Sequence, residues 1–266
     1  MRHPFWKCFC LLVVLAAKPV FAGDPVAICD DQAEWPPYTY YARTADGIDK
    51  TRIQGATAEL VAAIFDRIGL KYSYDLLPWN RCMYQVANFA DLGRYEIVAN
   101  ASYNKERAKL YYASTPLYQT RYGVAFTLAR FPNGPKIDRL EKLRKFHLCA
   151  PSGYNIAMYD LTPAQVSSSN RSYREILNRV SHARCDLGLV SIGVVRGLAQ
   201  IEDWSVPENV ILEPLRQIKP ITFHLLISRT SPRAQQLSVS INEAIIDLQQ
   251  DGTAGRILEA HTRIQY

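Results

Sequence analysis

Residues 100 to 107 read Asn-Ala-Ser-Tyr-Asn-Lys-Glu-Arg, and residues 113 to 118 read Ala-Ser-Thr-Pro-Leu-Tyr. The first segment follows Tyr95-Glu-Ile-Val-Ala99, a short apolar run that predicts a buried strand. It ends in Arg107, whose planar guanidinium matches a carboxylate with two parallel donors. From the residue alone, a surface arginine that pairs with Glu106 is the alternative.

Before this segment, the chain alternates between strand and helix patterns. Pro25-Val-Ala-Ile-Cys29 is a short apolar run that ends in two aspartates, and Ala56 to Leu70 carries its apolar residues on one helical face. Lys71 to Leu77 alternates like a strand, and a second helix begins at Trp79. The order strand, helix, strand, helix, strand predicts a mostly parallel sheet with helical crossovers.

After residue 118 the pattern restarts, which predicts a second α/β unit. The elements expected here are strands at 122–128, 146–150 and 185–190 and helices at 137–145 and 173–181. A strand at 221–228 and helices at 235–248 and 254–261 are left over. Two such units joined by extended segments indicate a cleft between them, where small-molecule sites commonly lie.

The N-terminus has the order of a secretory signal peptide. Arg2 and Lys7 precede the apolar run Cys8 to Ala17, and Val20 and Ala22 fit the cleavage positions. We therefore expect residues 1–22 to be removed after Ala22 and the protein to reach the periplasm. Cleavage removes three positive charges and lowers the net charge from +6 to +3, and no Lys/Arg run predicts a nucleic-acid partner.

Four cysteines remain after cleavage, which suggests two disulfides in an exported protein. They are Cys29, Cys82, Cys149 and Cys185, for which three connectivities are possible. No Cys-x-x-Cys spacing occurs, and the histidines are scattered singly, so we expect neither a metal site nor a cofactor.

The segments quoted first resemble the extracellular solute-binding proteins of family 3, the amino-acid receptors of ATP-driven (ABC) importers. Other pieces of the pattern follow in the same order: Glu34-Trp-Pro-Pro-Tyr38, Gly55, Pro78-Trp79, Ser152-Gly153 and Asp251-Gly252. The resemblance implies an α/β fold of the type II periplasmic-binding-protein class: two lobes, each a mostly parallel sheet flanked by helices, with two hinge crossovers. Lobe 1 would comprise 23–118 and 221–266, and lobe 2 would comprise 119–220, with hinges near 118–122 and 216–221.

The resemblance also implies site residues. Arg107 matches the arginine that takes the ligand's carboxylate, and Ser102 matches the hydroxyl residue that donates to the same group. Trp35, Tyr38 and Trp79 would form apolar walls, with burial in the core as the alternative. Ser152, Gly153 and Asn155 form a turn after a strand, where backbone N–H groups can face an anion.

One departure concerns the ligand's ammonium group. Ser191 stands where receptors for α-amino acids place an aspartate, so Asp30 or Asp31 would have to supply the negative charge. The lobe assignment further predicts one disulfide in each lobe, Cys29–Cys82 and Cys149–Cys185.

These features favour a monomeric binding protein, not an enzyme, that captures an amino acid or a related small carboxylate and delivers it to the permease of an ABC importer. A periplasmic sensor is one alternative. Another is an enzyme on the same fold, such as a cyclohexadienyl dehydratase, with Glu34, Asp30 or Asp31 as the general acid.

Overall fold

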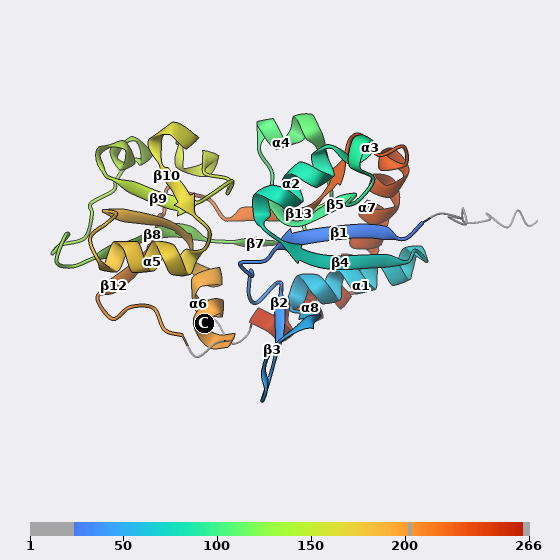
Figure 1. Cartoon of the computed structure of the whole chain (residues 1–266), viewed down its shortest axis with the longest axis horizontal. Helices are drawn as coiled ribbons and strands as arrows, with labels where there is room; N and C mark the ends of the chain where they lie inside the picture. Colours follow the sequence, from blue (N-terminus) through green and yellow to red (C-terminus); the bar gives the residue numbers. More distant parts are fainter. Residues whose placement is uncertain (1–23, 202–203, 263–266) are drawn as a thin grey trace, which may run out of the picture.

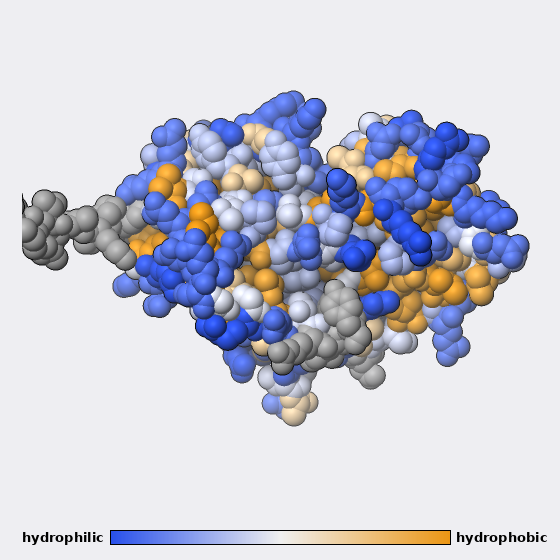
Figure 2. Space-filling view, turned by 180° about the vertical axis from the view of Figure 1, so that it is seen from behind, coloured by the Kyte–Doolittle hydropathy of each residue, from blue (hydrophilic) through white to orange (hydrophobic). Residues whose placement is uncertain are grey.

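The computed structural model describes residues 24–201 and 204–262, which fold into two lobes, each built on one sheet (Figure 1). The predicted signal peptide, residues 1–22, lies outside the described residues. Seen from behind, hydrophilic residues predominate at the outer ends of both lobes (Figure 2). Among residues 24–201 and 204–262, no helix is long and apolar enough to span a bilayer.

The first sheet has the strand order β4-β1-β5-β13-β6, and β7 also pairs with β13. β4, β1 and β5 run parallel, as the alternating pattern predicts, whereas β13 is antiparallel to β5, β6 and β7. The bounds are β1 Val26–Asp31, β4 Tyr72–Leu77, β5 Ile97–Ser102, β6 Tyr111–Ala113, β7 Tyr118–Thr120 and β13 Ile221–Ser228.

The second sheet has the order β10-β9-β11-β8-β12 and is mixed in the same way. β10, β9 and β11 are parallel, while β8 and β12 are antiparallel to their neighbours. The bounds are β8 Tyr122–Thr127, β9 Leu148–Pro151, β10 Ser167–Asn170, β11 Leu187–Ser191 and β12 Val210–Pro214. Each sheet is thus mostly parallel, as predicted, with one strand of opposite direction: β13 in the first sheet and β8 in the second.

Helices cover both sheets. In lobe 1, α1, α7 and α8 pack together and α2 lies against β1, β5 and β13, while in lobe 2 α5 packs on β8 to β12. The apolar face of α1 is buried, and the helix ends at Gly69 with φ 70°, a left-handed conformation that favours glycine. The helices are α1 Ala56–Ile68, α2 Trp79–Ala87, α3 Phe89–Leu92, α4 Lys105–Leu110, α5 Tyr173–Ser181, α6 Ile192–Ile201, α7 Ala234–Gln250 and α8 Thr253–Thr262.

Several segments differ from the sequence-based expectation. The helix expected at 137–145 is a 3₁₀ helix, η1, at Leu140–Lys145, and two further 3₁₀ turns are η2 Ala157–Tyr159 and η3 Pro163–Gln165. A hairpin of β2 (Tyr40–Thr44) and β3 (Gly47–Gln54), which was not predicted, projects from lobe 1 (Figure 1). The helix α6, also not predicted, follows β11 directly.

The chain passes between the sheets twice, and the two passages lie side by side. β7 pairs with the start of β13, so that Thr120 lies opposite Ile221 and Tyr118 opposite Phe223. β7 falls within the first predicted hinge, 118–122, while β13 begins at residue 221, where the second predicted hinge, 216–221, ends. The lobe limits at residues 118 and 221 stay a prediction.

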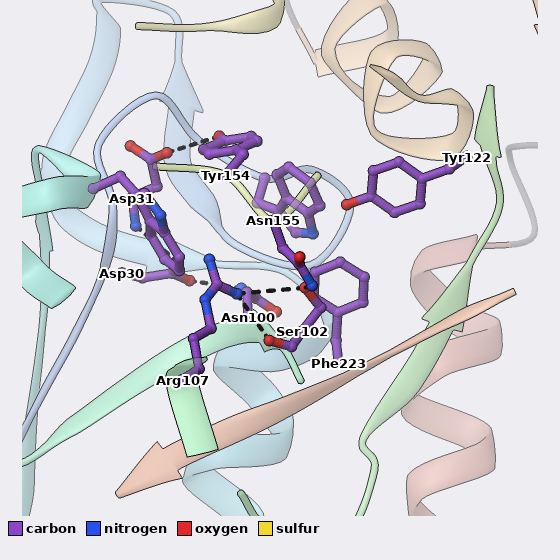
Figure 3. A pocket seen from close by; sticks show the side chains of 11 residues that line it. Asp30, Asp31, Asn100, Ser102, Arg107, Tyr122, Tyr154, Asn155 and Phe223 are labelled. Carbon is purple, nitrogen blue, oxygen red and sulfur yellow. Dashed lines mark hydrogen bonds between the residues drawn. The ribbon is translucent and has the colours of Figure 1, made fainter. Parts of the chain in front are cut away.

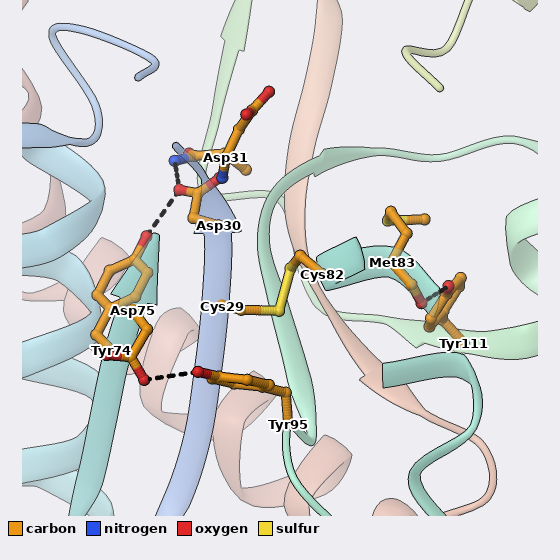
Figure 4. Close-up of a disulfide and its surroundings, with 10 residues drawn as sticks. Cys29, Asp30, Asp31, Tyr74, Asp75, Cys82, Met83, Tyr95 and Tyr111 are labelled. Carbon is orange, nitrogen blue, oxygen red and sulfur yellow. Dashed lines mark hydrogen bonds between the residues drawn. A yellow bond between two sulfur atoms is a disulfide. The ribbon is translucent and has the colours of Figure 1, made fainter. Parts of the chain in front are cut away.

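Each sheet carries one disulfide. Cys29 at the end of β1 is bonded to Cys82 in α2 (Figure 4), and Cys149 in β9 is bonded to Cys185 just before β11. This is the predicted pairing. The first bridge fixes the end of β1, where Asp30 and Asp31 lie, against the helix that begins at Trp79.

Candidate functional site

A cavity with about 320 Å³ of empty space lies between the lobes (Figure 3). Six residues of lobe 1 that the sequence analysis named as site candidates line it with Asn155 from lobe 2, together with four residues that were not predicted. The lining residues are Asp30, Asp31, Trp35, Trp79, Asn100, Ser102, Arg107, Tyr122, Tyr154, Asn155 and Phe223.

Arg107 is buried at one side of the cavity, with 7% of its surface exposed. Asn104 caps α4 by accepting a hydrogen bond from the Arg107 N–H, which fixes the backbone there. The guanidinium donates from Nη1 to the Ser102 carbonyl at 2.8 Å and from Nη2 to the Gly153 carbonyl at 3.2 Å. It also lies over the Trp79 ring, 5.4 Å from the centroid.

The charge of Arg107 is not compensated by an acidic side chain. Among the described residues, no aspartate or glutamate forms an ion pair with it, although two aspartates line the same cavity. Burial lowers the pKa of Arg107 to about 10, so the group stays positive at neutral pH. A buried cation with neutral hydrogen-bond partners is a strong attractor for an anion.

Asp30 and Asp31 end β1 and bring two carboxyl groups into the cavity. Asp30 accepts from the Tyr74 hydroxyl at 2.9 Å and from Asn100 Nδ2 at 2.6 Å (Figure 4 shows the first bond). Asp31 accepts from the Tyr154 hydroxyl of lobe 2 at 2.7 Å. Desolvation by burial raises the pKa of Asp30 to about 7 and the pKa of Asp31 to about 6.

Asn100 holds Asp30 in place and was not predicted as a site residue. Its side chain donates to Asp30 and Thr39, and its Oδ1 accepts from the hydroxyls of Thr57 and Tyr118, both at 2.7 Å. The residue has φ 50°, a conformation that asparagine tolerates better than most residues. This saturated network gives the buried carboxyl of Asp30 a fixed orientation.

Aromatic rings form the remaining walls. Trp35 lies 5.5 Å from Phe223, 5.6 Å from Tyr154 and 5.7 Å from Tyr173, measured between centroids. The expectation of aromatic walls from Trp35 and Trp79 thus agrees with their position in the cavity lining. Both residues are also buried, so each serves the core and the cavity at once.

The turn after β9 carries the contacts between the lobes. The Trp79 indole N–H donates to the Gly153 carbonyl at 3.0 Å, and Asn80 donates to the Ser152 hydroxyl at 2.9 Å. Asn155 Nδ2 donates to the Ser102 hydroxyl at 3.0 Å. The turn therefore presents the Gly153 carbonyl to Arg107, whereas the Ser152 N–H, expected to face an anion, donates within the sheet to Asn170.

Three predicted site residues lie outside the cavity lining: Gly153, whose carbonyl accepts from Arg107, Tyr38 and Ser191. The Tyr38 ring stacks on Tyr118 with centroids 3.6 Å apart and borders a separate pocket beside the crossovers. Ser191 is fully buried at the end of β11, where its hydroxyl lies 3.1 Å from that of Thr120. The position where amino-acid receptors are expected to carry an aspartate thus holds a serine, and its hydroxyl contacts Thr120 of β7.

Asn100, Tyr122, Tyr154 and Phe223 line the cavity but were missed. Tyr122 and Phe223 lie inside apolar strand patterns and read as core, so only their place next to the crossovers brings them to the cavity. Tyr154 lies between Gly153 and Asn155, in the turn that the sequence analysis singled out, so its place in that turn could have indicated a site residue. In the part of the chain that the structure describes, no group of three His, Cys, Asp or Glu side chains is placed to hold a metal ion.

We expect Gly153→Ala to favour separation of the lobes. Gly153 has φ 74°, and a Cβ there would lie 1.8 Å from Asn80 Oδ1 across the interface. Small-angle scattering should show a larger radius of gyration for the variant. Gly134→Ala is the matched control, because Gly134 also has φ 74° but its Cβ would meet only a Glu213 side-chain oxygen at 3.7 Å. Equal radii for both variants would contradict the expectation.

Comparisons with known proteins agree with this architecture. Residues 28–263 match the family model for bacterial extracellular solute-binding proteins, family 3. No curated protein matches the chain.

Three solved structures share the fold at low sequence identity. A histidine kinase sensor domain with similarity to periplasmic binding proteins matches with TM-score 0.70 at 17% identity, covering 89% of this chain and 95% of that one. The substrate-binding protein of an amino-acid ABC transporter gives 0.69 at 15% identity, with 90% and 100% covered. An ancestral amino-acid-binding protein, a precursor of cyclohexadienyl dehydratase, gives 0.65 at 16% identity, with 90% and 95% covered.

The family match spans nearly all of the described residues and both lobes that enclose the cavity. The chain therefore belongs to the bacterial extracellular solute-binding proteins, family 3.

Proposed function

We propose that this protein captures a small amino acid or a related small carboxylate in the inter-lobe cavity and delivers it to an ABC importer. The observation that carries the proposal is Arg107, a buried guanidinium in the cavity wall without an acidic partner among the described residues. A ligand carboxylate supplies the missing negative charge, and Ser102 and Asn155 are the nearest neutral donors.

The ligand's ammonium group binds at Asp30 and Asp31 in this proposal. Both carboxyls line the cavity, while Ser191 does not. All charged groups that meet the ligand then belong to lobe 1, and lobe 2 contributes the uncharged side chains of Tyr154 and Asn155. Binding to lobe 1 comes first, and lobe 2 closes over the ligand by rotation about the paired strands β7 and β13.

The cellular setting belongs to the same proposal. The signal-peptide pattern of residues 1–22 supports export to the periplasm, where in this proposal the mature protein acts as a monomer that docks on a membrane permease. Uptake assays in cells that lack the gene separate a transport role from a sensor role. A transport role predicts that these cells lose uptake of the solute that the protein binds, whereas a sensor role predicts unchanged uptake.

A thermal-shift screen of the mature protein against amino acids, polyamines, small carboxylates and sugars tests the binding function. A ligand at 100 times its dissociation constant adds about 2.7 kcal/mol to the free energy of unfolding, which raises the thermal midpoint measurably. We expect hits among the amino acids or small carboxylates. Absence of any shift across the panel would refute the proposal.

The raised pKa of Asp30 supports a second candidate, an enzyme of the cyclohexadienyl dehydratase type. A carboxylic acid with a pKa of about 7 in an aromatic cavity can donate a proton to a leaving group at neutral pH. Turnover of prephenate or arogenate by the purified protein, lost in Asp30→Asn, would favour the enzyme. Binding of these compounds without product formation would favour the receptor.

We expect stability and ligand affinity to change in opposite directions with pH. Asp30 and Asp31 have raised pKa values, about 7 and about 6, so between roughly pH 4 and pH 7 the folded protein holds protons that the unfolded chain has released. The contribution of these groups to the free energy of unfolding therefore falls as pH rises through this window. Affinity for an ammonium group rises over the same window, because the ionised carboxylates bind it.

Comparison with Asp30→Asn isolates the contribution of Asp30 together with its coupling to the neighbouring Asp31, because more distant titrating groups cancel. The thermal midpoint of the ligand-free wild type, relative to Asp30→Asn, should fall between pH 5 and pH 8. The dissociation constant of the wild type for an amino acid, measured by calorimetry relative to that of Asp30→Asn, should fall over the same pH range. A relative midpoint that rises with pH would contradict the assignment of a raised pKa to Asp30.

A further inference from the structure

A second open space, which we name the outer groove, continues outward from the cavity. It comprises about 1480 Å³ including open solvent, and it shares Asp31 and Trp79 with the cavity as common walls. Its lining residues are Asp31, Gln32, Ala33, Glu34, Tyr41, Ile48, Lys50, Pro78, Trp79, Asn80, Ser152, Ser168, Ser169, Arg171, Ser172 and Arg174. Both lobes contribute, so this groove takes its shape when the lobes are together.

The negative charge of Glu34 in the outer groove is already compensated. Glu34 is buried and accepts from both terminal nitrogens of Arg43, at 2.8 and 2.7 Å, and from the Tyr41 N–H at 2.9 Å. Arg174 of lobe 2 lies 3.8 Å from the same carboxylate. The guanidinium of Arg43 helps to lower the pKa of Glu34, which stays ionised and leaves the pair with Arg43 neutral.

Two cations of the groove face it without such compensation. Lys50 in β3 of lobe 1 and Arg171 between β10 and α5 of lobe 2 are exposed, and neither forms an ion pair with any acidic side chain in the described ranges. The lining of the groove also includes four serine hydroxyls and the Asn80 amide, which donate readily to oxygen. The groove is therefore suited to an oxygen-rich, negatively charged group.

We propose that the outer groove binds a second, distal acidic group of an extended ligand whose amino-acid end lies in the cavity. This rests on the function proposed above and extends it to amino-acid derivatives such as acidic dipeptides. The terminal carboxylate meets Arg107, and the ammonium group meets Asp31, which borders both spaces. The distal carboxylate then meets Lys50 and Arg171 from opposite lobes, which favours the closed arrangement.

Calorimetry with three probes tests this inference: alanine, glutamyl-alanine and glutaminyl-alanine. The two dipeptides differ by one distal charge and are otherwise matched in size. We expect the acidic dipeptide to bind about fivefold more tightly than its amide counterpart at low ionic strength, as two exposed charge pairs allow. High salt should shrink this ratio, because exposed charges are screened.

Variants show which residues of the outer groove cause the preference for the acidic dipeptide. Lys50→Ala and Arg171→Ala should each reduce the ratio, and the double variant should bring it to about one. Arg184→Ala, which removes an exposed arginine of lobe 2 outside the groove, should leave the ratio unchanged.

The outcomes separate the two proposals. Equal binding of the two dipeptides, or a ratio that persists in the double variant, would overturn the role of the outer groove. Binding of alanine without binding of either dipeptide would also overturn it and leave the receptor function standing. Failure of every amino acid, small carboxylate and dipeptide to bind would overturn both.

Discussion

Arg107→Ala should abolish the thermal stabilisation that a carboxylate ligand produces in the wild type. Loss of one partner from a buried, hydrogen-bonded charge pair costs about 2 to 5 kcal/mol, so we expect the dissociation constant to rise at least about 30-fold. Calorimetry with the best ligand of the thermal-shift screen measures the change. Removal of the buried charge relieves its desolvation but also removes its hydrogen bonds to the Ser102 and Gly153 carbonyls, so the stability of the ligand-free variant is measured alongside.

Arg107→Lys sharpens this test. Lysine keeps the positive charge but lacks the planar fork that matches a carboxylate bidentately, so the variant should bind more weakly than the wild type and more tightly than Arg107→Ala. Arg184→Ala serves as the control for a general loss of surface charge. An unchanged dissociation constant in Arg107→Ala would refute the carboxylate site.

Loss of the Cys29–Cys82 disulfide should have a large effect on stability. The bridge spans 53 residues, and the entropy of closing such a loop predicts a loss of about 4 kcal/mol in Cys29→Ala/Cys82→Ala. For a protein of this size, that lowers the thermal midpoint by roughly 8 to 16 °C, which calorimetry detects. Ligand affinity should fall as well, since the bridge fixes Asp30 and Asp31 against the helix that carries Trp79.

The other disulfide provides a matched control. Cys149–Cys185 spans 36 residues, so its removal should cost about the same, near 4 kcal/mol. It joins β9 to the start of β11 and touches none of the lobe 1 carboxyls. At a temperature where both variants are folded, only Cys29→Ala/Cys82→Ala should bind more weakly. Equal affinities would show that the first bridge does not position the site.

Elements with strong periodicity were predictable from the sequence. The helix at 173–181 has the bounds of α5, and the predicted strands and helices between residues 25 and 99 correspond to β1, α1, β4, α2 and β5. In these segments one face is apolar at the period of the element, so local pattern and burial agree. The prediction of an α-helix at 137–145 was wrong. The segment is rich in charged residues, and Leu143 is the one buried residue of η1, so a short 3₁₀ helix is enough to bury it.

Part of the candidate site was not predictable because it depends on contacts between distant segments. Tyr154 reaches Asp31 across 123 positions of sequence, and Asn100 binds Asp30 across 70. Local sequence patterns contain no information about contacts between residues so far apart in the sequence. Arg107, Ser102 and Asp31 were found because a family resemblance already carries that three-dimensional information, whereas it misplaced Tyr38 and Ser191 relative to the cavity.

The pairing of Thr120 with Ile221 has a consequence for how such chains can be rebuilt. The segment between these residues leaves and re-enters the first sheet at one point, through neighbouring antiparallel strands. Exchange of that whole segment between relatives needs only two junctions, both within a single strand pair. A chimera made this way would take the charged cavity residues of lobe 1 from one parent and the lobe that closes over them from the other. Ligand recognition and lobe closure could then be exchanged separately.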